Sequence, residues 1–221
     1  MISQSPTGSS SRLQPGGLAH SPEEIARIPL VGTWLLVGAN FFLLVPFFYA
    51  FFLLQSSNDN HAFKPHGVHP PSLAIGTIAL ALVLGSIALT SISVPRLRAQ
   101  TTLSSFVASG WVGILLLVGA VVAQIWQLSH LGFGIVDGGF ASVFVALSVF
   151  YTIEVGVLAL WLISLTNRAG YESRHPIAVM DPQRSSVESP TPITALATSY
   201  LIFSCFLAAA GAISWVVLYF L

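Results

Sequence analysis

Charged residues are scarce in this chain: Asp, Glu, Lys and Arg together make up 7% of its 221 residues, against about 25% in an average soluble domain. Apolar residues make up 54%. A water-soluble fold is therefore the class that the composition argues against most strongly. The acidic and basic residues balance, and no basic patch alternates with aromatic residues, so nothing in the chain indicates a nucleic-acid partner.

Cysteine and histidine are missing from the places where membrane redox proteins need them. Cys205 is the one cysteine, which excludes a disulfide framework and any site built on paired cysteines. Haem or copper inside a membrane is normally bound by histidines that project from helices into the bundle. All six histidines instead fall in the N-terminal region, in predicted loops or at a predicted membrane boundary: His20, His61, His66, His69, His130 and His175. We therefore expect no catalytic, cofactor-binding or metal-binding residue in this chain.

Three of these histidines, His61, His66 and His69, cluster in one predicted loop beside Lys64. They could bind a metal weakly. The simpler interpretation is a solvated loop, because no carboxylate or cysteine nearby completes a coordination shell.

Long apolar runs are what the sequence has in abundance. Five of them approach or exceed the roughly 20 residues that a helix needs to cross the hydrocarbon core of a membrane. They cover residues 28–54, 72–93, 103–128, 138–165 and 193–221. Their apolar residues do not alternate with polar ones, as the strands of a membrane barrel would require. The sequence therefore predicts an all-α, polytopic membrane helix bundle with five transmembrane helices.

The basic residues predict how this bundle is oriented. Residues 1–27 are rich in Ser, Gly and Pro, and we expect them to form a disordered cytoplasmic tail, with the transmembrane bundle covering residues 28–221. With the N-terminus inside, Lys64 is the one basic residue outside. The inner segments then hold Arg12, Arg27, Arg96, Arg98, Arg168, Arg174 and Arg184. This bias towards positive charge inside predicts an N-in, C-out topology.

Glu154 is the only ionisable residue deep in a predicted span. A charged carboxylate at that depth costs several kcal/mol, so Glu154 is expected to be protonated or to face a polar partner. The candidate polar neighbours are Asn40, Gln124 and Tyr151, and Tyr151 precedes Glu154 by three residues on the same helix. Two interpretations remain open. Glu154 is either a proton-transfer or lipid-headgroup site, or a protonated residue whose hydrogen bonds fix helix packing.

The segment from residue 115 to 156 resembles a helical hairpin of subunit III of the haem-copper (cytochrome c type) oxidases. That family has a glutamine near the outer end of one helix, a short loop with Asp-Gly, and a following helix with a Phe-His-x-x-His-Val pattern. Residues 33–52, TWLLVGANFFLLVPFFYAFF, also resemble a family helix with an aromatic run. The matching positions in the hairpin are Gln124, Asp137, Gly138, Ser142, Phe144, Phe150, Val155 and Gly156.

The resemblance implies a subunit without an active site of its own. Members of this family pack against subunit I, which carries haem and copper, assemble with subunit II and bind phospholipids in a cleft between two groups of helices. They help to sustain proton uptake. Here the first two spans are expected to form the smaller group. The chain departs from the family at Ala39, where a family glutamate stands, and at Tyr151 and Glu154, which replace the two family histidines.

Two classes of function therefore follow from the sequence. The first is a non-catalytic subunit III of a terminal oxidase in aerobic respiratory electron transport. The alternative is a small transporter or channel in which Glu154 lines a polar path, since intramembrane carboxylates often mark function. No inverted repeat of the kind found in many transporters is apparent in the sequence.

Overall fold

The computed structural model describes residues 22–57, 63, 71–98, 103–174 and 192–221, and these residues form five helices and no strand. All five helices are long and apolar enough to cross a membrane. The predicted class, a bundle of five membrane-spanning helices, is confirmed. The helices are α1 (Pro22–Ser56), α2 (Leu73–Arg98), α3 (Leu103–Ser129), α4 (Gly139–Arg174) and α5 (Pro192–Phe220).

Three helices extend beyond their predicted boundaries by several residues: α1, α4 and α2, which ends at Arg98 and not at residue 93. α1 begins at Pro22, inside the segment predicted as a tail, while residues 1–21 lie outside the described residues. Proline suits the first position of a helix, where its missing N–H has no partner to lose. α4 continues past residue 165 to Arg174. Hydropathy marks where a helix leaves the hydrocarbon and not where the helix ends. The last turns of α4 are polar and remain helical beyond that point, with an Arg168–Glu172 ion pair at 3.3 Å.

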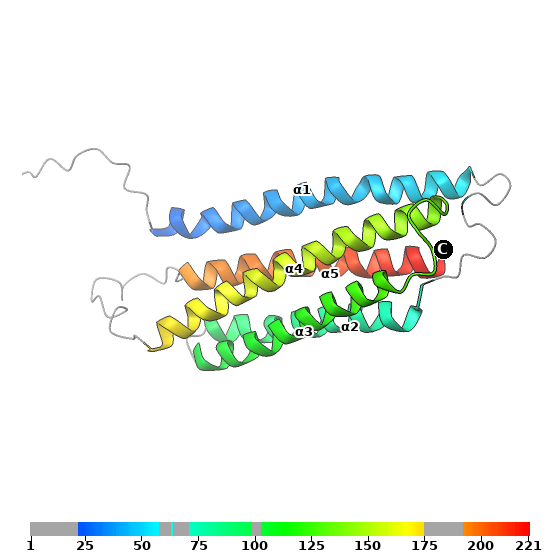
Figure 1. Ribbon diagram of the computed structural model, residues 1–221. Helices are drawn as coiled ribbons and strands as arrows, with labels where there is room; N and C mark the ends of the chain where they lie inside the picture. The colour runs from blue at the N-terminus through cyan, green and yellow to red at the C-terminus, as the bar shows by residue number, and fades with distance from the viewer. Residues whose placement is uncertain (1–21, 58–62, 64–70, 99–102, 175–191) are drawn as a thin grey trace, which may run out of the picture.

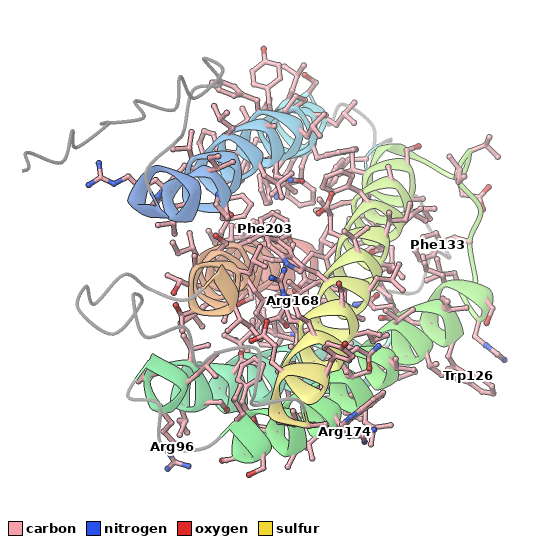
Figure 2. The ribbon with its side chains drawn as sticks, turned by 90° about the vertical axis from the view of Figure 1, so that its left-hand side faces the viewer. Arg96, Trp126, Phe133, Arg168, Arg174 and Phe203 are labelled. Atoms are coloured by element: carbon pink, nitrogen blue, oxygen red, sulfur yellow. The ribbon has the colours of Figure 1, made fainter. Side chains whose placement is uncertain are left out.

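α5 lies at the centre of the bundle and contacts α1, α2 and α4 (Figures 1 and 2). α4 crosses the bundle diagonally, so that its beginning lies beside the end of α1 and its end beside the beginning of α3 (Figure 1). α1 and α4 therefore meet near one end of the bundle and diverge towards the other. α1 is the least buried of the five spans.

α2 belongs with α3 and α5 and not with α1. The prediction that the first two spans form a separate group is therefore wrong. Small residues explain the pairing, because between membrane helices they allow the backbones to approach. A Cβ built on Gly113 of α3 would lie 3.1 Å from the Ser86 hydroxyl of α2, and one on Gly119 would lie 3.4 Å from Leu82. A hydrogen bond of 2.7 Å joins Ser93 to Ser109 across the same pair of helices.

The connection between α3 and α4 is a short structured turn. Gly138 has a φ of 129°, a conformation that L side chains rarely adopt. The hydroxyl of Ser142 donates to the carbonyl oxygen of Ile135 at 2.6 Å and so ties the start of α4 to this turn. The turn makes α3 and α4 the antiparallel hairpin that carries the family resemblance.

Basic residues gather at one end of the bundle. Arg96 at the end of α2 and Arg168 and Arg174 near the end of α4 lie at the end of the molecule nearest the viewer in Figure 2, the end at which α1 starts. At the opposite end Asp137 is the one charged side chain among the described residues. The structure thus places these described arginines at a single end, which the predicted topology requires.

Candidate functional site

A polar pocket of about 40 Å³ lies between α2, α3, α4 and α5, towards the end that carries the α3–α4 turn. Its walls combine apolar and neutral polar side chains, and no residue with an ionisable carboxylate, imidazole or amine lines it. The lining residues are Gly76, Leu80, Gln124, Phe144, Leu147, Ser148, Tyr151, Gly211, Ser214, Trp215, Leu218 and Tyr219.

Two tyrosines reach the pocket because a glycine stands opposite each of them. The Tyr151 hydroxyl of α4 occupies the space where a Cβ on Gly211 of α5 would lie. The Tyr219 hydroxyl of α5 does the same at Gly76 of α2. In both places the absence of a side chain lets a bulky phenol cross to the neighbouring backbone.

A hydrogen-bonded cluster adjoins the pocket on the side of the helix ends. Gln127, which is only 3% exposed, donates from Nε2 to the carbonyl oxygen of Ser72 at 3.1 Å and to the Tyr219 hydroxyl at 2.5 Å. Tyr219 also packs edge-on against Phe144, with ring centroids 6.2 Å apart. The cluster ties the end of α3 to the beginning of α2 and the end of α5.

Several buried polar atoms in and beside the pocket have no hydrogen-bond partner among the described residues: the Tyr151 hydroxyl, Trp215 Nε1 and Gln127 Oε1. Tyr151 is only 8% exposed. Leaving one buried donor or acceptor unsatisfied costs about 1–3 kcal/mol. Tyr151 and Trp215 line the pocket, and Gln127 belongs to the adjoining cluster.

The structure divides the four predicted site residues into two pairs. Gln124 and Tyr151 line the polar pocket, whereas Glu154 and Asn40 do not. Although Tyr151 and Glu154 are three residues apart on α4, Tyr151 points at Gly211 and is buried, while Glu154 is partly exposed. Glu154 makes no hydrogen bond or ion pair with any described residue.

Aromatic contacts show which way Glu154 faces. Phe150, one turn earlier on the same strip of α4, packs against Phe47 of α1, with ring centroids 5.8 Å apart. Trp161, two turns later, packs against Phe203 of α5, with centroids 6.0 Å apart. Glu154 lies between these contacts along α4 and is therefore on the side of α4 that faces α1 and α5.

Asn40 lies on the side of α1 that faces α4. It precedes Phe47 by seven residues, which puts it on the same side of α1 as Phe47, the side that contacts α4. Because α1 and α4 run antiparallel, Asn40 and Glu154 both lie on the same side of the Phe47–Phe150 contact along the bundle. At a rise of about 1.5 Å per residue, their positions along the bundle axis differ by about 4–5 Å. Asn40 is 4% exposed, its Nδ2 donates to the carbonyl oxygen of Leu36 at 3.2 Å, and its Oδ1 has no partner. Asn40 and Glu154 are not hydrogen-bonded to each other.

Sequence reasoning missed the residues that complete the pocket. Gln127 carried a signal, since it follows Gln124 by three residues and so lies on the same face of α3. Trp215 and Tyr219 are four residues apart on α5 and so lie on the same face of that helix. Gly76 and Gly211 carried no signal, because their role depends on which side chain of another helix lies opposite.

The described residues contain no group of three or more His, Cys, Asp or Glu side chains that could hold a metal ion. His61, His66 and His69 lie outside the described residues. The pocket offers neutral hydroxyl, indole and amide groups, which suit hydrogen bonding and not nucleophilic or redox chemistry. No model of a known protein family matches the chain, and no curated protein matches it either.

Proposed function

We propose that this chain is a non-catalytic accessory subunit of a haem-copper terminal oxidase, in the place of subunit III in aerobic respiratory electron transport. It would pack against subunits I and II in a bacterial inner membrane, and the haem and copper would belong to those partners. The sequence pattern of the α3–α4 hairpin is the basis for the oxidase assignment.

The position of Glu154 is the observation that supports a subunit role most strongly. This carboxyl group lies partly exposed in the middle of α4 and has no partner among the described residues. A charged carboxylate at the centre of a membrane costs about 2.5–3.5 kcal/mol on insertion scales. A hydrogen-bond donor on a neighbouring subunit, or a lipid headgroup beside α4, would remove that cost.

The separation of α1 from α4 fits the same role. The two helices diverge towards the end that carries the arginines, and α1 is the least buried of the five spans (Figure 1). Phospholipid chains or a partner helix would cover the exposed apolar surface of α1.

No observation favours the transporter or channel alternative. A conducting path would need Glu154 to line a polar cavity, but the polar pocket of the bundle excludes Glu154 and contains no ionisable carboxylate, imidazole or amine. The apolar core of α2 to α5, including Leu117, Leu158 and Leu162, is fully buried.

Affinity purification of the tagged chain from native membranes in mild detergent tests the proposal. We expect haem-containing subunits to co-purify, with the absorbance of reduced haem in the eluate. Glu154→Leu should reduce the amount of haem recovered per chain. Glu154→Gln should largely preserve that amount, because the amide still forms hydrogen bonds. As a control, Val157 is an exposed neighbour of Glu154 on α4, and Val157→Leu should leave the recovery of haem unchanged. Recovery of the wild-type chain alone, without haem, would refute the oxidase assignment.

A further inference from the structure

The polar pocket between α2, α3, α4 and α5 plays no part in the proposed subunit function. We propose that it is a hydration site, in which a small cluster of water molecules is bound by the Tyr151 hydroxyl, the Trp215 indole N–H and the Gln124 amide. This inference stands whether or not the chain assembles with an oxidase.

The size of the pocket suits water. Its volume is about 40 Å³, and one water needs roughly 10–15 Å³ of such space, so two or three molecules fit. A lipid chain or an organic cofactor is too large for that space.

The polar groups of the pocket also suit water. Tyr151 and Trp215 each present a donor without a protein partner, and the Gln124 side chain supplies both a donor and an acceptor. A bound water normally makes two to four hydrogen bonds to such groups. The pocket has no charged lining residue, which argues against an ion as its occupant.

The pocket is built into the packing of the helices. Gly211 and Gly76 allow the hydroxyls of Tyr151 and Tyr219 to reach its walls. The Gln127–Tyr219–Ser72 cluster lies between the pocket and the helix ends at the α3–α4 turn, and Gln127 Oε1 there also lacks a partner. Polar groups therefore continue from the pocket towards one end of the bundle, from which water can enter.

Radiolytic hydroxyl labelling tests the proposal, because X-rays convert bound water into hydroxyl radicals that oxidise the adjacent side chains. The full chain would be irradiated in native membranes, with any subunits that accompany it, and its peptides analysed by mass spectrometry. Two internal controls are available: Tyr200, which is buried but does not line the pocket, and Trp161, which packs among aromatic rings. We expect Tyr151 and Trp215 to be oxidised several-fold faster than Tyr200 and Trp161.

Thermal stability gives a second readout. If water bonds to the Tyr151 hydroxyl, Tyr151→Phe lowers the Tm, because the variant loses that bond and leaves the water short of a partner. If the pocket is dry, the same substitution removes an unsatisfied hydroxyl and leaves the Tm unchanged or raises it. Oxidation of Tyr151 and Trp215 no faster than that of the two control residues, whatever the Tm values, would overturn the proposal.

Discussion

Single residues decide how closely the helices of this protein approach, and the glycines show this best. Gly211 and Gly76 each lie opposite a tyrosine hydroxyl, and Gly110 of α3 lies opposite the side chain of Thr166 of α4. Gly156 of α4, in contrast, has no atom near the position of a built Cβ. The same residue type is thus required at some positions of the bundle and replaceable at another.

Gly211→Ala should destabilise the protein. Alanine is favoured over glycine in a helix by about 1 kcal/mol, but here its methyl group would collide with the Tyr151 ring, and such overpacking costs about 1–3 kcal/mol. Gly156→Ala meets open space and should be neutral or stabilising by about 0.5–1 kcal/mol. Thermal denaturation in detergent compares the two variants. Equal Tm values for both would mean that the Tyr151–Gly211 contact does not constrain the helices.

Gln127 and Tyr219 should be coupled energetically, since the amide donates to the phenol oxygen between α3 and α5. Hydrogen bonds between membrane helices contribute about 0.6 kcal/mol on average and about 1.7 kcal/mol at most. A double-mutant cycle with Gln127→Leu and Tyr219→Phe, measured by reversible unfolding in mixed micelles, should therefore give a coupling energy in that range. Additive effects of the two substitutions would contradict the hydrogen bond.

At the scale of whole elements, α1 differs from the other four helices. It contacts α5 and α4, and its contact with α4 is concentrated where both approach the α3–α4 turn. There Phe51 of α1 packs edge-on against Phe63, with ring centroids 5.3 Å apart, and Phe63 packs in turn against Phe140 at 6.0 Å. Because burial from water does not drive association inside a membrane, this aromatic packing is what holds the end of α1 in place.

Phe51→Ala should therefore weaken the attachment of α1, whereas Phe52→Ala should have little effect. The two residues are adjacent, yet Phe51 is 1% exposed and Phe52 is 47% exposed. Removing a buried phenylalanine ring costs about 3–5 kcal/mol in soluble proteins, which is an upper guide here. Cross-linking by a bis-maleimide between α1 and α4, with cysteines at the contacting pair Phe47 and Phe150 in a Cys205→Ala background, would report the loss of contact. Equal cross-linking in both phenylalanine variants would contradict this description of α1.

At the scale of the molecule, the distribution of charge between the two ends of the bundle predicts the orientation. Arg27, Arg96, Arg168 and Arg174 lie at one end, and cytoplasmic segments of membrane proteins carry such an excess. The end with the α3–α4 turn should then face the outside of the cell. On that topology the polar pocket lies in the outer half of the membrane.

Labelling with a membrane-impermeant maleimide tests the orientation. In a Cys205→Ala background, Val136→Cys in the α3–α4 turn should react in intact cells, because this side chain is 92% exposed and predicted to face outwards. Ser173→Cys near the end of α4 should react only after the membrane is opened. The reverse pattern would invert the topology.

Much of the fold could be predicted from the sequence because it depends on local composition. Five runs of apolar residues determine five membrane-spanning helices, since a backbone inside hydrocarbon must satisfy its own hydrogen bonds. The boundaries at α3 and α5 were predicted within a residue for the same reason. The end of α4 was not, because its last turns are polar and hydropathy reports the membrane boundary and not the end of a helix.

What the sequence by itself determined is the class of protein, the number of spans and the lone carboxyl group of Glu154 within them. What only the tertiary structure decided is which helices pack together and which polar residues meet. Tyr151 and Glu154 share a helix face in the sequence, yet a glycine on α5 lets Tyr151 reach the pocket while Glu154 lies on the side of α4 that faces α1 and α5. The reason is physical: in a membrane, packing depends on the match between a small residue on one helix and a large one on another, and that match exists only in three dimensions.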